Sequence, residues 1–220
     1  MDKAEGWLVV DEQRVALADL LQTLTPEEWA AASLCDGWTV RDVAAHLPMA
    51  ALTPTIEVLV AAARARGSFN RMIHDTAVRR AATQSPTQII ADLRSTVGSR
   101  RLAPTTFWRD PLLDILVHTQ DIARPIGRTV AMPTDATRTA LDWAWKRGFP
   151  FFPARRLRGI RMVAADADWQ RGDGAEVRGP VGALLLLSTG RLAALADLTG
   201  PGLSRLVPTE AHPTTTDRAG

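Results

Sequence analysis

The sequence of 220 residues has a single cysteine, little net charge and no long apolar run. One cysteine excludes an intrachain disulfide framework and is typical of a reducing compartment, so we expect a cytoplasmic protein. The net charge of +2 gives no reason to expect a nucleic-acid partner. The most apolar stretch, GALLLLSTG, is too short to span a bilayer, and the acidic start MDKAEGWLVV is unlike a signal peptide. We therefore expect a soluble protein that is not bound to a membrane.

The first two thirds of the chain show the apolar spacing of helices. Thr25–Pro26 and Ser85–Pro86 are helix starts, each with a capping hydroxyl and a proline at the first helical position, and Asp110–Pro111 repeats the pattern. The sequence predicts a short helix from Thr25 and long helices over about 2–24, 39–65, 86–101 and from 110 to the stop at 125–127, with one more ending at 148. Prolines at 48 and 54 must kink or divide the second long helix. Four long helices with shorter companions predict a bundle over residues 1–148.

The pattern changes after residue 148. A segment rich in proline, phenylalanine and arginine marks a boundary near 149–153. The following stretch alternates as two strands around the turn Gly172–Gly174, and PVGALLLLSTG returns to helix. We expect a small α/β domain over 154–207 and a disordered tail over 208–220, because the tail has no apolar periodicity. The predicted fold class is α+β.

The first candidate for chemistry is His46, at the end of GWTVRDVAAHL. Thr39 and Asp42 have the spacing of a capping box, so a helix begins near Val40. On that helix His46 lies at the border of the apolar stripe, one turn beyond Asp42. A histidine in this position is either a hydrogen-bonded core residue or a ligand.

A second cluster lies in DPLLDILVHTQDIARPIG. The helix is apolar around most of its circumference, while Asp114, His118 and Asp121 share one face. Burying a carboxylate without a partner is costly, so Asp114 and His118 require one. A divalent metal would satisfy both, with His46 as a third ligand and a fourth position left for water or substrate. An ordinary carboxylate–imidazole pair is the alternative.

Three segments carry a resemblance to a known family. GWTVRDVAAHL, DILVHTQDIARPIGR and LRGIRMVAADADWQRGDGAEVRGPVGALLLLSTGR, in this order, resemble the mycothiol-dependent maleylpyruvate isomerase family. The resemblance covers nearly the whole chain, from the first helix to about Leu206. It implies a DinB-like metal-binding four-helix bundle followed by a small C-terminal α/β domain.

The family's ligand pattern can be carried over position by position. In that family a metal, usually zinc, is held by a histidine at the end of the GW[ST]xx[DE] helix and by an ExxxH pair, which match His46, Asp114 and His118 here. The best-known members carry glutamate where this chain has Asp114, so the shorter carboxylate must approach differently or its helix must sit closer. The resemblance also implies that Arg191, in STGR, reaches toward the active site as a catalytic residue. The alternatives for Arg191 are a cation at a helix C-terminus or a surface charge.

The resemblance further implies a divalent metal, zinc by the family pattern, together with a low-molecular-weight thiol of the mycothiol type as cosubstrate and a small electrophilic substrate. The sequence does not distinguish isomerisation of the substrate from thiol transfer to it, and it assigns no oligomeric state. The rival hypothesis is a non-catalytic metal-binding or ligand-binding module with a regulatory or structural role. Such a module would not need all three ligands in place.

Four other residues have weaker assignments. His74 is expected at a solvated helix position, His212 lies in the tail, and Cys35 is interpreted as structural. Asp121 either accepts a hydrogen bond from a ligand imidazole or pairs with Arg124 or Arg41.

Overall fold

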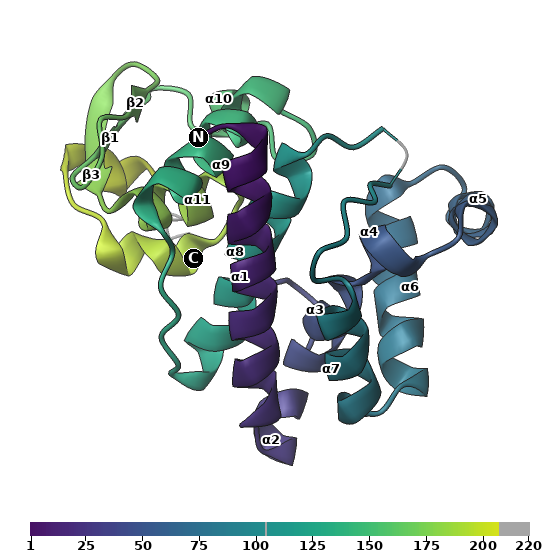
Figure 1. Ribbon diagram of the computed structural model, residues 1–220. Coiled ribbons are helices and arrows are strands. Elements are labelled where there is room, and N and C mark those ends of the chain that lie inside the picture. Colours follow the sequence, from purple (N-terminus) through teal and green to yellow (C-terminus); the bar gives the residue numbers. More distant parts are fainter. Residues whose placement is uncertain (104, 207–220) are drawn as a thin grey trace, which may run out of the picture.

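The computed structural model describes residues 1–103 and 105–206, which form a helical bundle followed by a small sheet with further helices (Figure 1). This architecture confirms the predicted α+β class. The helices of the bundle are α1 (Lys3–Gln22), α2 (Pro26–Ala30), α3 (Val40–His46), α4 (Met49–Leu52), α5 (Thr55–Arg64), α6 (Phe69–Thr83), α7 (Pro86–Ser95), α8 (Arg109–Ala123), the 3₁₀ turn η1 (Arg124–Ile126) and α9 (Thr134–Arg147).

Short polar side chains start several of these helices. Thr25, Thr39 and Ser85 each accept a hydrogen bond from the backbone N–H three residues later, and each forms a full capping box. The predicted starts at these three positions are confirmed. The prolines at 48 and 54 divide the predicted helix over 39–65 into α3, α4 and α5, because proline cannot donate the backbone hydrogen bond of a helix interior.

Two predicted helix boundaries are wrong. The helix predicted over 86–101 ends at Ser95, because Gly98 adopts a positive φ of 80° and the chain turns away. The helix predicted to follow an Asp110 cap begins earlier, at Arg109. Asp110 instead accepts hydrogen bonds from the Phe107 N–H at 2.6 Å and from Trp143 Nε1 at 2.7 Å. Its carboxylate thereby ties the start of α8 to α9.

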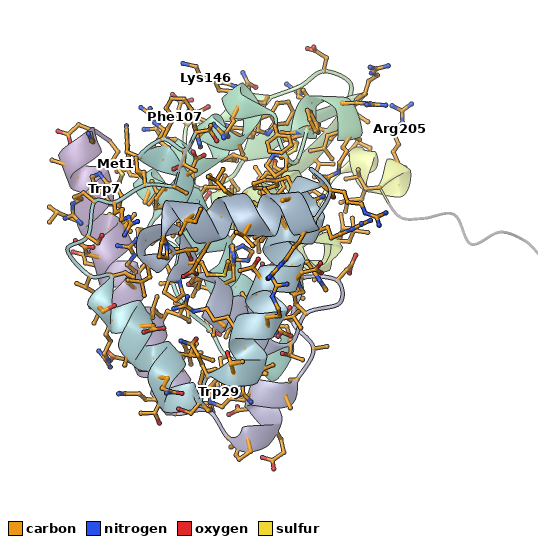
Figure 2. All side chains as sticks on the ribbon, turned by 90° about the vertical axis from the view of Figure 1, so that its right-hand side faces the viewer. Met1, Trp7, Trp29, Phe107, Lys146 and Arg205 are labelled. Atoms are coloured by element: carbon orange, nitrogen blue, oxygen red, sulfur yellow. The ribbon has the colours of Figure 1, made fainter. Side chains whose placement is uncertain are left out.

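Helix α8 lies at the centre of the bundle. It packs against α1, α3 and α9, and its apolar side chains are buried on nearly every side. Trp7 and Trp29 are buried toward opposite ends of the bundle (Figure 2). A helix enclosed in this way holds its polar side chains at fixed positions, so groups on its one polar face are well placed to form a site.

The sheet differs from the predicted hairpin. Its three strands are β1 (Ile160–Ala164), β2 (Gln170–Arg171) and β3 (Ala175–Gly179), in the order β2–β1–β3. β1 pairs antiparallel with β2 and parallel with β3, so the strands on either side of the Gly172–Gly174 turn do not pair with each other. The turn instead carries the chain across the start of β1. A Cβ at Gly172 would lie 2.3 Å from the Ile160 carbonyl oxygen, so only glycine allows this crossing.

The remaining elements cover this sheet and join it to the bundle. They are α10 (Pro153–Arg156), α11 (Val181–Ser188) and the 3₁₀ segments η2 (Leu192–Asp197) and η3 (Pro201–Arg205). The almost wholly buried α11 packs against α9 on one side and against β1 and β3 on the other. One apolar core therefore runs from the bundle into the C-terminal part. The domain boundary near 149–153 stays a prediction.

Two further sequence predictions concern the C-terminal tail and the membrane. The tail predicted to be disordered, residues 208–220, lies outside the described residues. None of the helices within residues 1–103 and 105–206 combines the length and the apolar character that crossing a bilayer requires.

Candidate metal centre

Helices α3 and α8 bring His46 and His118 together. The two helices pack against each other, with Val43 and Leu116 fully buried. His46 is the last residue of α3, and His118 lies in the middle of α8. Their imidazole rings meet edge to face with centroids 5.1 Å apart. Both side chains are 14% exposed, so neither is sealed in the core.

Asp114 lies between the two imidazoles. Its Oδ1 is 3.3 Å from His118 Nε2 and 3.6 Å from His46 Nε2. The donor atoms of all three residues lie within 4.8 Å of one another. We call His46, Asp114 and His118 the triad. The aspartate reaches both rings although it is one methylene shorter than the glutamate of the resembling family.

The triad spacing fits a metal ion. Ligand atoms bound tetrahedrally to one Zn²⁺ at about 2.0–2.2 Å lie about 3.3–3.6 Å apart, which is the spacing of Asp114 Oδ1 from the two imidazole nitrogens. The 3.6 Å contact of His46 Nε2 is too long for a hydrogen bond. Two imidazoles and one carboxylate are also a usual donor set for zinc with an open fourth position.

The other ring nitrogens of the two histidines have different surroundings. His118 Nδ1 lies 2.8 Å from Asp121 Oδ2, the kind of outer hydrogen bond that orients a metal-binding imidazole. His46 Nδ1 is buried and has no hydrogen-bond partner among the described residues. A hydrogen bond at Nδ1 therefore orients the His118 ring, whereas His46 is held mainly by packing. Part of this packing comes from Trp38, whose ring centroid lies 5.3 Å from that of His46.

Asp121 is the centre of a second cluster, which joins α8 to the C-terminal part. Its side chain is fully buried, and Arg191 donates from Nε to Oδ1 at 2.9 Å and from Nη2 to Oδ2 at 2.6 Å. The Cys35 thiol lies 3.1 Å from Asp121 Oδ2 and 3.3 Å from Arg191 Nη2. We call Cys35, Asp121 and Arg191 the Asp121 network. Asp121 thus contacts the His118 imidazole and Arg191. It pairs with neither Arg124 nor Arg41, the two arginines proposed from the sequence.

The turn that follows α11 directs the Arg191 side chain toward the Asp121 network. Gly190 has a φ of +101°, which lets the chain reverse after the helix. The Arg191 N–H then donates to the Leu186 carbonyl at 2.8 Å, and Arg191 Nη1 donates to the Thr189 carbonyl at 2.7 Å. The side chain is only 10% exposed. Arg191 does reach toward the candidate site, but its guanidinium is bound to protein groups on three sides.

Charge and burial shift the pKa values of these groups. Burial alone would raise the pKa of the Asp121 carboxyl, but hydrogen bonds from His118 and Arg191 outweigh it and hold that pKa well below its ordinary value. Burial likewise opposes ionisation of Asp114, yet the neighbouring His46 and His118 keep its pKa far below the usual range. Both carboxylates are therefore ionised, which is the form that binds cations.

Cys35 is the residue that sequence reasoning underestimated. It belongs to the loop between α2 and α3, where the Leu34 N–H donates to the Asp121 carbonyl at 3.2 Å and the Trp38 N–H to the Cys35 carbonyl at 3.0 Å. These bonds hold the thiol next to α8, far from it in sequence. No spacing pattern links residues 35 and 121, so only the fold brings them together.

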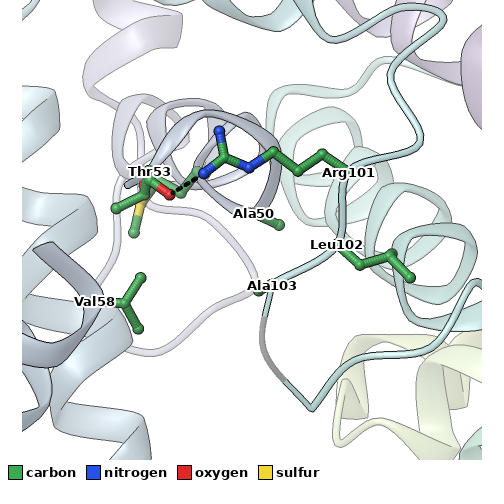
Figure 3. Close-up of a pocket in the computed structure, with 7 residues that line it drawn as sticks. Ala50, Thr53, Val58, Arg101, Leu102 and Ala103 are labelled. Atoms are coloured by element: carbon green, nitrogen blue, oxygen red, sulfur yellow. Dashed lines mark hydrogen bonds between the residues drawn. The ribbon is translucent and has the colours of Figure 1, made fainter. Parts of the chain in front are cut away.

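The other candidates are not part of the triad, although the His74 ring lies 6.1 Å from that of Trp38. His74 is 46% exposed on α6 and contacts the neighbouring Asp75, as expected for a solvated position. His212 lies outside the described residues. A cavity of about 170 Å³ lies beside α4, and Arg101 reaches across it to donate to the Thr53 carbonyl at 3.4 Å (Figure 3). None of the triad residues lines this cavity.

Solved structures show the same fold. Two crystal structures of the mycothiol-dependent maleylpyruvate isomerase, one of them of a histidine-to-alanine mutant, match this chain with a TM-score of 0.58 and 13% sequence identity. The match covers 91% of this chain and 93% of each of those chains. At this identity the likeness establishes the fold and no more.

Sequence comparison establishes the family. No curated protein sequence matches the chain. The family profile described as "Mycothiol maleylpyruvate isomerase N-terminal domain" matches residues 10–123, which is more than half of the chain and runs from α1 to the end of α8. The matched region contains the whole triad, and the resemblance predicted from the sequence is confirmed. This chain belongs to the mycothiol maleylpyruvate isomerase N-terminal domain family.

Proposed function

We propose that this protein is a divalent-metal-dependent enzyme that uses a low-molecular-weight thiol of the mycothiol type on a small electrophilic substrate. One observation carries the proposal. In a member of this family, the possible metal-ligand atoms of His46 on α3 and of Asp114 and His118 on α8 lie within 4.8 Å of one another. Zinc is the proposed metal, because two imidazoles and a carboxylate suit it and leave one coordination position free.

The chain's own residues divide the work at this centre. His46, Asp114 and His118 would hold the metal, and Asp121 would orient the His118 ring. The Asp114 side chain is 34% exposed, so a thiol can approach from solvent on that side. Trp38, which is 8% exposed, packs against both imidazoles and excludes water from another side.

The proposed reaction begins with addition of the thiol sulfur to an electrophilic carbon. A divalent ion held by the triad would lower the pKa of the thiol and so favour its thiolate form at neutral pH. Elimination of the thiol after rotation about the attacked bond gives isomerisation, and retention of the thiol gives transfer. The isomerases of known structure support the first outcome by family relation.

The catalytic role of Arg191 stays a prediction. A substrate carboxylate would need two free N–H groups on one edge of the guanidinium. Nε and Nη2 already form such a pair of bonds to Asp121. These contacts favour a role in positioning the site over a role in holding substrate.

The proposal is tested by metal analysis of the purified protein, followed by thiol titration of the cobalt-substituted form. We expect one metal per chain, and a change in the charge-transfer absorption of cobalt when the thiol binds. His118→Ala should remove stoichiometric metal, whereas the control His74→Ala should keep it, because His74 lies on the exposed face of α6.

Two results would contradict this function. Equal metal loss in both variants would show that the triad is not the site. Cobalt binding that no thiol perturbs would leave a metal-binding module without thiol chemistry, which is the rival hypothesis.

A further inference from the structure

The polar contacts of the Asp121 network connect the C-terminal part of the chain to the proposed metal centre. Arg191 lies just beyond α11, and its guanidinium grips the carboxylate of Asp121 on α8, 70 residues earlier. The same carboxylate holds His118 Nδ1 at 2.8 Å. The chain of contacts therefore runs from Arg191 through Asp121 to His118 and ends at the triad.

The directions of these hydrogen bonds follow from the chemistry of the donors. Arginine only donates, so both oxygens of Asp121 act as acceptors toward Arg191. The proton in the contact between His118 and Asp121 Oδ2 then belongs to His118 Nδ1. When an imidazole binds a metal and keeps its proton on Nδ1, it binds through the lone pair on Nε2, which in His118 is the atom that faces Asp114 at 3.3 Å.

Burial makes this arrangement depend on Arg191. Asp121 is fully buried, and the other group within reach of Oδ2 besides His118 and Arg191 is the weakly polar Cys35 thiol. Without the guanidinium, a buried carboxylate would lose its main charge partner and both of its bidentate bonds. Its position opposite His118 Nδ1 would no longer be fixed.

We propose that Arg191 is a positioning residue through which the C-terminal part sets the metal affinity of the bundle, by holding Asp121 so that His118 presents Nε2 to the metal. The inference rests on the proposed function in so far as the triad binds metal. It assigns to Arg191 an action through Asp121 and His118 that needs no contact with substrate.

The test measures the dissociation constant of Co²⁺ and the visible absorption of the Co²⁺ complex in the full-length protein. Arg191→Ala should weaken Co²⁺ binding by about 10- to 100-fold, the usual effect of losing an outer partner of a ligand histidine. Its absorption should also change shape, because the His118 ring is no longer fixed. The Co²⁺ affinity of Arg191→Lys should fall between those of wild type and Arg191→Ala, since lysine keeps the positive charge but cannot form two parallel hydrogen bonds to a carboxylate.

The matched control is Arg124→Ala. Arg124 donates to Asp197 at 2.7 Å and so also joins the end of α8 to the C-terminal part, but it does not contact Asp121. We expect Arg124→Ala to bind Co²⁺ as wild type does. If Arg191→Ala fails to fold, Asp121→Asn and Arg191→Lys carry the same test, and each should weaken Co²⁺ binding.

The outcomes separate the inference from the proposed function. Wild-type affinity and absorption in folded Arg191→Ala, or in both substitute variants, would overturn the inference and leave the metal centre standing. An equal loss in Arg191→Ala and Arg124→Ala would overturn it too, because any contact with the C-terminal part would then suffice. A wild-type protein that binds no Co²⁺ would overturn both.

Discussion

The two sides of the His118 imidazole contrast sharply. On the Nδ1 side, Asp121 is fully buried and its oxygens are engaged by His118, Arg191 and the Cys35 thiol. On the Nε2 side, Asp114 is 34% exposed and its contacts to the imidazoles are 3.3 and 3.6 Å long. On the Asp121 side, both carboxylate oxygens accept hydrogen bonds. On the Asp114 side, the possible metal ligands lie close together but are only loosely paired.

This difference suggests that the two sides of His118 have different roles, the Asp121 side in stability and the Asp114 side in metal binding. Breaking a buried, fully paired group leaves a charge without a partner, which destabilises the fold. Breaking a partly exposed and loosely paired group costs less stability, because water replaces part of what is lost. We therefore expect substitutions in the Asp121 network to lower the free energy of unfolding, and substitutions in the triad to act mainly on metal binding.

The largest effect is expected for Asp121→Ala in the metal-free protein. This change leaves Arg191, which is 10% exposed, as a buried charge without a partner, so the free energy of unfolding should fall by about 3–5 kcal/mol. Urea unfolding measures it. Asp197→Ala is the control: the Arg124–Asp197 pair is exposed, so its loss should cost about 0–1 kcal/mol. Similar losses in the two variants would show that the Asp121 network is no more stabilising than a surface pair.

The next largest effect is expected for Asp114, which faces Nε2 of His118. Asp114→Asn removes the negative charge between His46 and His118 and should weaken Zn²⁺ binding at least about 100-fold, beyond the loss expected for an outer partner. The metal-free protein should lose less stability than it does in Asp121→Ala, because Asp114 is 34% exposed and water replaces part of the lost contacts. Competition with a chelator and urea unfolding give the two values. Asp114→Glu keeps a carboxylate ligand and is the control, with a much smaller loss of affinity than Asp114→Asn. Weakening in the glutamate variant as large as in the asparagine variant would argue against a carboxylate ligand at this position.

The smallest effect is expected at Cys35. Cys35→Ala removes one weak donor to Asp121 Oδ2 and should lower the free energy of unfolding by about 1 kcal/mol. Cys35→Ser keeps a donor and should lose less. Thermal unfolding of the two variants side by side provides the measurement. A loss from Cys35→Ala comparable to that from Asp121→Ala would mean that the thiol, and not Arg191, holds the carboxylate in place.

Local chemistry made much of the fold predictable. Thr25, Thr39 and Ser85 start helices because each side chain satisfies a backbone N–H within its own turn, and this requires no distant contact. The end of α7 and the pairing of the strands were predicted wrongly. At both places backbone geometry at glycines, Gly98 and Gly172, decides where the chain goes, and a residue type alone does not fix that path.

The candidate site divides in the same way. Asp114 and His118 are four residues apart on one helix, so their proximity follows from helical periodicity. His46 was placed with them by family resemblance and by its position at the end of a helix. Cys35 was assigned a structural role, and the arginine partner of Asp121 was sought at residues 124 and 41, because nothing in the spacing points to residue 191.

By itself the sequence determined the helix starts at Thr25, Thr39 and Ser85, the α+β class, the family and the pair Asp114–His118. All of these depend on neighbours along the chain or on motif order. Only the tertiary structure decided that Arg191 and Cys35 meet at Asp121 and that the two nitrogens of His118 face opposite surroundings. The physical reason is that these contacts join α8 to residues 70 or more positions away, and their geometry is fixed by the packing of α11 on α9 and of the 31–38 loop on α8.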